Sequence, residues 1–116
     1  MKLQSFLLTV LFMCFYIIDI IDIKAYGVDM HFSMFLCRCR IWIEDSKGYR
    51  IAGDDSYRDC SARIDENISF PDQTYTVHAK VEGSFEKEKV RGPFNEITCF
   101  SIHGSVDKWK FDQTSC

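Results

Sequence analysis

Hydrophobic and polar residues alternate with a period of two along much of the chain, a pattern typical of β-strands with one buried face. In the stretch 33–43 every second position is apolar or a cysteine: Phe35, Cys37, Cys39, Ile41 and Ile43. A turn signal of sequence Asp-Ser-Lys-Gly follows at 45–48, and a short strand-like stretch follows at 49–52. The pattern therefore predicts a first strand at 33–43 and a hairpin over residues 41–52.

Two further stretches alternate in the same way, at residues 62–70 and 75–82. The second alternates without a fault, whereas Glu66 interrupts the apolar side of the first. A turn of sequence Pro-Asp-Gln at 71–73 separates them. We therefore predict a β-hairpin over residues 62–82, with His78 on its solvated face.

The C-terminal segment adds two shorter strands. Residues 83–93 are charged and contain glycine and proline, so they are predicted to form a long exposed loop. Residues 96–103 and 106–111 are predicted strands, which brings the total to six. No window has apolar residues at i, i+3, i+4 and i+7 over three helical turns. The fold class is therefore predicted to be all-β, as a small antiparallel sandwich or barrel.

The N-terminus has the layout of a secretory signal peptide. Lys2 precedes a largely apolar run of 13 residues at 6–18, after which Asp19 and Asp22 interrupt the hydrophobicity and Ala25 provides a small residue for cleavage. A membrane-spanning helix needs roughly 20 apolar residues, so an anchor is the weaker alternative. We predict a signal peptide at 1–25, a single domain at 26–116 and secretion.

The cysteines fit an oxidising compartment. The chain has 116 residues and six cysteines, and removal of Cys14 with the signal leaves Cys37, Cys39, Cys60, Cys99 and Cys116. In a secreted domain this small, these residues indicate disulfides, and an odd number implies two bridges and one free thiol. Each bridge contributes roughly 2–4 kcal/mol of stability.

Charge and composition exclude several function classes. With 14 Lys and Arg against 17 Asp and Glu, the formal charge is −3, which argues against a nucleic-acid binder. The run Glu-Lys-Glu-Lys at 86–89 mixes both signs and is predicted to be a solvated loop that binds neither membrane nor nucleic acid. The two tryptophans, Trp42 and Trp109, are expected to fill the core or to cover a strand.

Candidate chemistry is sparse. Cys37 and Cys39 are too closely spaced for a zinc-binding pair, and the three histidines are scattered, so no metal or cofactor is expected. A general acid–base set for RNA cleavage can be drawn from His78, Glu82, Arg91 and His103, but nothing in their spacing requires it, so we expect no enzyme activity. Asn67-Ile68-Ser69 is a candidate glycosylation site whose asparagine is expected to point outward.

The cysteines and strands resemble those of the MAX effectors of plant-pathogenic fungi, which include ToxB-like toxins and avirulence proteins. The residues that carry the resemblance are Cys39-Arg40-Ile41-Trp42-Ile43, the stretches 65–70 and 75–81, and the closing Ser115-Cys116. The resemblance implies six strands in two three-stranded antiparallel sheets, with bridges Cys39–Cys99 and Cys60–Cys116. Cys37 is extra to the pattern and is an alternative to Cys39 in its bridge, and the segment 83–93 is longer than in the family.

A second resemblance is to the ribonuclease-like effectors of mildews. The carrying residues are Phe35-Leu36-Cys37 and the terminal Cys116. Those proteins have a helix after the first motif, whereas a hairpin is predicted here, so this resemblance ranks second.

The first resemblance implies a monomeric, non-enzymatic virulence or avirulence factor that is secreted, reaches host cells and binds host proteins. Small domains of the heavy-metal-associated type are among the partners it implies. Exposed strand edges offer unpaired backbone groups for such a partner. We expect the first hairpin to bind it through Arg38, Arg40 and Trp42. The alternatives are a ribonuclease-like effector and an extracellular toxin or inhibitor module stapled by disulfides.

Overall fold

The computed structural model describes residues 25–116. The predicted apolar run of the signal peptide and Cys14 lie outside the described residues. Ala25, the predicted cleavage position, is the first residue of the first strand. In the described part of the chain, no helix has the length and hydrophobicity needed to cross a membrane.

The described residues form nine strands and no helix. Their bounds are β1 Ala25–Met34, β2 Arg38–Asp45, β3 Arg50–Gly53, β4 Arg58–Asp59, β5 Ile64–Pro71, β6 Tyr75–Val81, β7 Lys89–Phe94, β8 Thr98–Ser105 and β9 Lys108–Thr114.

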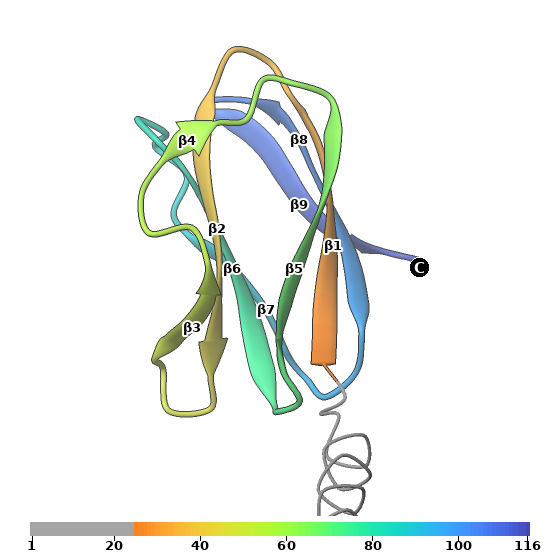
Figure 1. Cartoon of the computed structure of the whole chain (residues 1–116). Helices are drawn as coiled ribbons and strands as arrows, with labels where there is room; N and C mark the ends of the chain where they lie inside the picture. The colour runs from red at the N-terminus through yellow and green to blue at the C-terminus, as the bar shows by residue number, and fades with distance from the viewer. Residues whose placement is uncertain (1–24) are drawn as a thin grey trace, which may run out of the picture.

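Two sheets pack face to face (Figure 1). The four-stranded sheet has the order β5-β1-β8-β9, and the five-stranded sheet has the order β3-β2-β6-β7, with the short β4 also paired to β2. All strand pairs are antiparallel except β1 and β8, which run parallel. The parallel pair is possible because most of the chain separates the two strands and serves as the crossover.

The core fills the space between the sheets. On β6 the alternation predicts burial correctly, since Tyr75, Val77, Ala79 and Val81 are all fully buried. Aromatic rings link the two sheets: Phe70 meets Tyr75 edge-on at 4.6 Å between ring centroids, and Phe94 meets Phe100 at 5.7 Å. The Tyr75 hydroxyl forms a hydrogen bond of 2.7 Å with the Thr98 hydroxyl. Such contacts hold the sheets in one relative position.

The prediction of an all-β sandwich with disulfides is confirmed, but the strand inventory differs. The sheets contain four and five strands instead of three each, and one pair is parallel. The expected first strand at 33–43 is two strands, because the chain turns between Met34 and Arg38. Leu36 takes a positive φ of 44° in this turn.

The predicted hairpin over residues 62–82 is wrong. β5 pairs with β1 in the four-stranded sheet, whereas β6 pairs with β2 in the other sheet. The turn after Pro71 therefore crosses between the sheets, and the two strands face each other across the core instead of sharing a ladder. Alternation reports which face of a strand is buried but carries no information about its hydrogen-bonded partner.

The predicted loop at 83–93 is also partly wrong. Its second half is β7, which pairs with β6 at the edge of the five-stranded sheet. Charged residues are common on edge strands, so a charged stretch need not be a loop.

Candidate binding surfaces

The disulfides differ from the pairing that the first resemblance implies. Cys39 is bridged to Cys60, and Cys99 is bridged to Cys116. The expected bridges Cys39–Cys99 and Cys60–Cys116 are therefore both wrong. Cys60 directly follows β4, which pairs with β2 beside Cys39, and Cys116 follows β9, which pairs with β8. Each bridge thus joins neighbours within one sheet.

Cys37 is the free and buried thiol of the described residues. Its Sγ lies 2.9 Å from the carbonyl oxygen of Phe35, to which it donates. Burial raises the pKa of this thiol. Because Cys39 is in a disulfide, the Cys37-Arg38-Cys39 motif offers no pair of thiolates to a metal.

The predicted surface of Arg38, Arg40 and Trp42 lies on the outer face of β2, but β2 is an inner strand. It has β6 on one side and β3 with β4 on the other, so it offers no edge to a partner. Trp42 is 7% exposed, because the Arg40 guanidinium lies 4.2 Å from the centre of its ring. The edge of this hairpin is β3 and not β2, which carries Arg38, Arg40 and Trp42. Trp42 covers its strand as predicted, and Trp109 is in the core.

His78 is buried instead of solvated. It lies directly opposite Trp42 across the β2–β6 ladder, and the two rings stack with centroids 5.2 Å apart and planes inclined at 19°. Its Nε2 lies 2.8 Å from the Thr76 hydroxyl and 3.5 Å from the Glu44 carboxylate, and its Nδ1 is hydrogen-bonded to Glu88.

Sequence reasoning missed Glu44 and Glu88, which reach His78 from β2 and from the segment before β7. The register of β2 against β6 brings Glu44 near, and no sequence pattern shows that register. One ligand atom from each of these two glutamates and from His78 lies within 4.8 Å of the others, which makes them the candidate metal ligands of the described residues.

The acid–base set considered for RNA cleavage is not assembled. His78 points outward from the five-stranded sheet, whereas His103 lies on the outer face of the four-stranded sheet near Asp112. The core separates the two histidines, so they cannot flank one phosphate.

The edge formed by β7 and β9 is covered by cationic side chains. Lys89 donates to the carbonyl oxygen of Trp109 at 2.6 Å, and Arg91 donates to that of Phe111 at 2.7 Å. These carbonyls point away from β8, so the lysine and arginine occupy positions that an added strand would need. This edge is therefore protected against pairing.

The short strands at the opposite edge are covered in a similar way. Arg50 donates to the carbonyl of Gly53 at 3.2 Å, and Arg38 donates to that of Tyr57 at 2.9 Å. Arg40 does the same for Asp54 at 3.0 Å. β3 and β4 therefore offer little free backbone to a partner.

Arg58 ties this edge together by bridging the two sheets. It reaches from β4 to the Glu66 carboxylate on β5 with two hydrogen bonds, at 2.8 and 2.6 Å, and it pairs with Asp54 at 3.0 Å. Burial by itself would lower the pKa of Arg58, but Asp54 and then Glu66 outweigh it and raise the pKa.

β5 is the long edge that remains. Among residues 25–116, β1 is its only strand partner, and the sole side-chain hydrogen bond to its backbone reaches Pro71 at its end. It is the edge strand facing β3 and β4 in Figure 1. Eight residues at about 3.3 Å each give an edge roughly 26 Å long.

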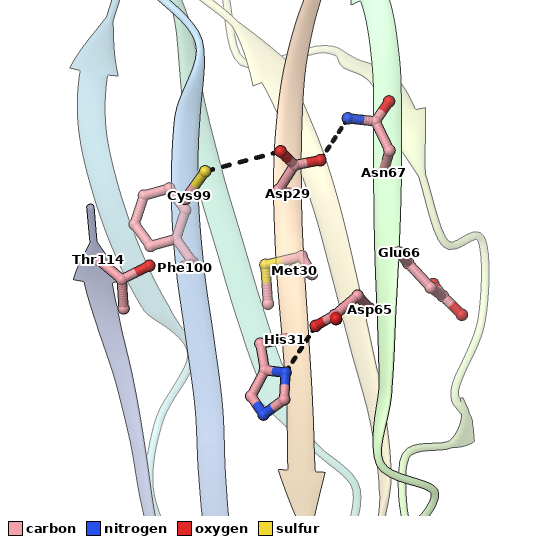
Figure 2. A pocket seen from close by; sticks show the side chains of 9 residues that line it. All are labelled: Asp29, Met30, His31, Asp65, Glu66, Asn67, Cys99, Phe100 and Thr114. Atoms are coloured by element: carbon pink, nitrogen blue, oxygen red, sulfur yellow. Dashed lines mark hydrogen bonds and ion pairs between the residues drawn. The ribbon is translucent and has the colours of Figure 1, made fainter. Parts of the chain in front are cut away.

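A shallow hollow of about 410 Å³ lies beside β5 on the outer face of the four-stranded sheet (Figure 2). In it Asp29 accepts a hydrogen bond from the Asn67 amide at 2.6 Å, and His31 pairs with Asp65 at 2.6 Å. The disulfide sulfur of Cys99 lies 3.7 Å from Asp29. The candidate glycosylation residue Asn67 is thus exposed, as expected, and belongs to this hollow.

Neither a protein-family model nor a curated protein matches this chain. Among solved structures, the fold is similar to part of the human-specific toxin intermedilysin, with a TM-score of 0.51 and 14% identity over 80% of this chain and 24% of that chain. A structure described as "Trapped Toxin" has the same TM-score and identity over 81% of this chain and 24% of that one. The chain thus spans about a quarter of the length of these toxins. At this identity the likeness is one of fold alone.

Proposed function

We propose that the chain is a secreted, non-enzymatic effector that binds a host protein by adding one of its extended segments to β5. The observation that carries this proposal is the edge of β5, which pairs with β1 alone and whose backbone receives a side-chain hydrogen bond only at Pro71, in contrast to the cation-covered edges at β9 and β3. In strand addition, backbone hydrogen bonds supply affinity, and alternate side chains supply specificity.

The charge beside β5 supports a basic partner segment. Asp65, Asn67 and Ser69 share the outer face of β5, and Asp29 lies in the adjacent hollow. Side chains of an added strand would lie about 5 Å from those of β5 on the same face. Lysine or arginine at alternate positions of the partner would therefore meet Asp65.

The proposal keeps the binding role that the first resemblance implies but does not depend on the family. The bridges and the sheet sizes differ from those that the resemblance implies. Host proteins, including small domains of the heavy-metal-associated type, remain the proposed partners. Arg40 is no longer the preferred contact, because it packs on Trp42.

Amide NMR with a model peptide of alternating lysine and valine tests the proposal. We expect shift changes centred on residues 64–71, and we expect a peptide with glutamate in place of lysine to cause none. The variant Asp65→Lys should weaken binding of the lysine peptide. The control Asp112→Lys makes the same charge change on the outer face of β9 and should leave binding of that peptide unchanged. Changes centred on β3 or β9, or no changes at millimolar peptide, would refute binding at β5.

A further inference from the structure

We propose that Glu44, His78 and Glu88 form a binding site for a divalent transition-metal ion, with Zn²⁺ as the reference ion. Ligand atoms from the three residues lie within 4.8 Å of one another. An imidazole nitrogen with carboxylate oxygens is a ligand set that zinc accepts, with bonds of about 2.0–2.2 Å. Such bonds bring ligand atoms to roughly 3.3 Å apart, so on binding both carboxylates must close on one ring nitrogen of His78; Glu88 now lies at Nδ1, and Glu44 lies 3.5 Å from Nε2.

The charges of the cluster favour a cation. The two carboxylates carry two negative charges, and His78 supplies at most one positive charge. Within residues 25–116, neither Glu44 nor Glu88 forms an ion pair with a lysine or arginine. Nearby Lys80 instead donates to the carbonyls of Ser84 and Glu86. A divalent ion bound to a neutral imidazole would balance both carboxylates.

The surrounding contacts orient these side chains as the supporting residues of a metal site do. The Trp42 indole N–H donates to the second carboxylate oxygen of Glu44 at 2.7 Å. The His78 ring is held between the Trp42 face and the Thr76 hydroxyl. Only 9% of the His78 side chain is exposed, against 42% for Glu88, so the open side of the site faces solvent at Glu88.

This site lies on the five-stranded sheet, whereas β5 belongs to the other sheet. Metal binding and strand addition therefore stand or fall separately. The inference also revises the expectation of no metal, which rested on the scattered positions of the histidines in the sequence.

Isothermal titration of the purified, disulfide-bonded protein with Zn²⁺, and with Mg²⁺ as a hard-ion comparison, tests the site. We expect one Zn²⁺ per chain and no Mg²⁺ binding at the same concentration, because Mg²⁺ prefers oxygen ligands only. Zn²⁺ should shift the imidazole NMR signals of His78 and leave those of His31 and His103 in place.

Variants assign the ligands. Glu88 lies in an exposed segment, so the variant Glu88→Gln should fold normally. Its affinity for Zn²⁺ should fall by roughly tenfold or more. His31→Asn removes another histidine–carboxylate pair, on the opposite sheet, and should bind Zn²⁺ like the unaltered protein. The proposal is overturned if no stoichiometric Zn²⁺ binding occurs, if Glu88→Gln binds unchanged, or if the shifted signals belong to His31 or His103.

Discussion

Arg58 and Glu66 join the two sheets through a pair of parallel hydrogen bonds at one open edge of the sandwich. The side chains are 27% and 36% exposed, so solvent screens the pair only in part. A bidentate arginine–carboxylate pair is the strongest kind of side-chain hydrogen bond that an edge can use.

Breaking this pair should destabilise the protein. We expect Arg58→Met and Glu66→Gln each to lower the free energy of unfolding by about 1–2 kcal/mol, and a double-mutant cycle in urea to show coupling of about 1 kcal/mol. The exposed pair Arg38 and Glu82, at 3.1 Å, is the matched control and should couple by less than about 0.5 kcal/mol. Equal coupling in the two pairs would contradict this ranking.

The bridges predict a specific peptide map. Digestion without reduction should release one linked peptide pair that contains Cys39 and Cys60 and another that contains Cys99 and Cys116. The bridged residues are 21 and 17 positions apart, so removing either bridge should cost about 3 kcal/mol of stability. A peptide that links Cys39 to Cys99 would instead restore the pairing implied by the effector resemblance.

Stability should fall at alkaline pH. Burial raises the pKa of both the Cys37 thiol and the Tyr75 hydroxyl above their ordinary values of 9.0 and 10.0. At pH values well below 9 both groups are protonated in the folded and unfolded states, and their contribution is fully present. As the pH rises further, the unfolded state loses these protons first, so the folded state loses stability.

Urea titrations at several pH values from 7 to 10 measure this effect. Cys37→Ala should flatten the fall between pH 8.5 and 9.5. An unchanged slope in this variant would mean that Cys37 does not contribute.

Uncovering the β9 edge should promote self-association. In the double variant Lys89→Ala and Arg91→Ala, the carbonyls of Trp109 and Phe111 lose their donors and become available to another chain. Light scattering after gel filtration should then show dimers or larger species. Lys108→Ala with Lys110→Ala removes the same charge without uncovering these carbonyls and should stay monomeric; association in this control would point to charge instead of the edge.

The sequence predicted which residues are buried better than it predicted which strands pair with each other. The inner face of β6 was predicted correctly because it is continuous and apolar, from Tyr75 to Val81, whereas His78 on its outer face was expected to be solvated and is buried. β1 carries the same signal, since Val28, Met30, Phe32 and Met34 are buried and alternate with polar residues. The predicted strands begin only at residue 33, so they leave out β1 except for its last two residues.

The candidate sites depended on contacts that no local pattern encodes. Arg40 and Trp42 are two positions apart on one strand, so their proximity was readable from the sequence. The burial of His78 was not, because it requires Trp42 to stand opposite in the β2–β6 register. The free edge at β5 likewise depends on a parallel pair between distant strands, which alternation cannot reveal.

The position of β1 between β5 and β8 limits the order in which the strands of this protein can pair during folding. Val28 faces Ile68 on one side and Thr98 on the other, 40 and 70 positions further along (68 − 28 and 98 − 28). Contacts this distant form slowly, and half of them must wait for synthesis to reach the last quarter of the chain. The four-stranded sheet therefore cannot be completed until most of the chain has been made, whereas β2 can pair with β3, β4 and β6 well before then.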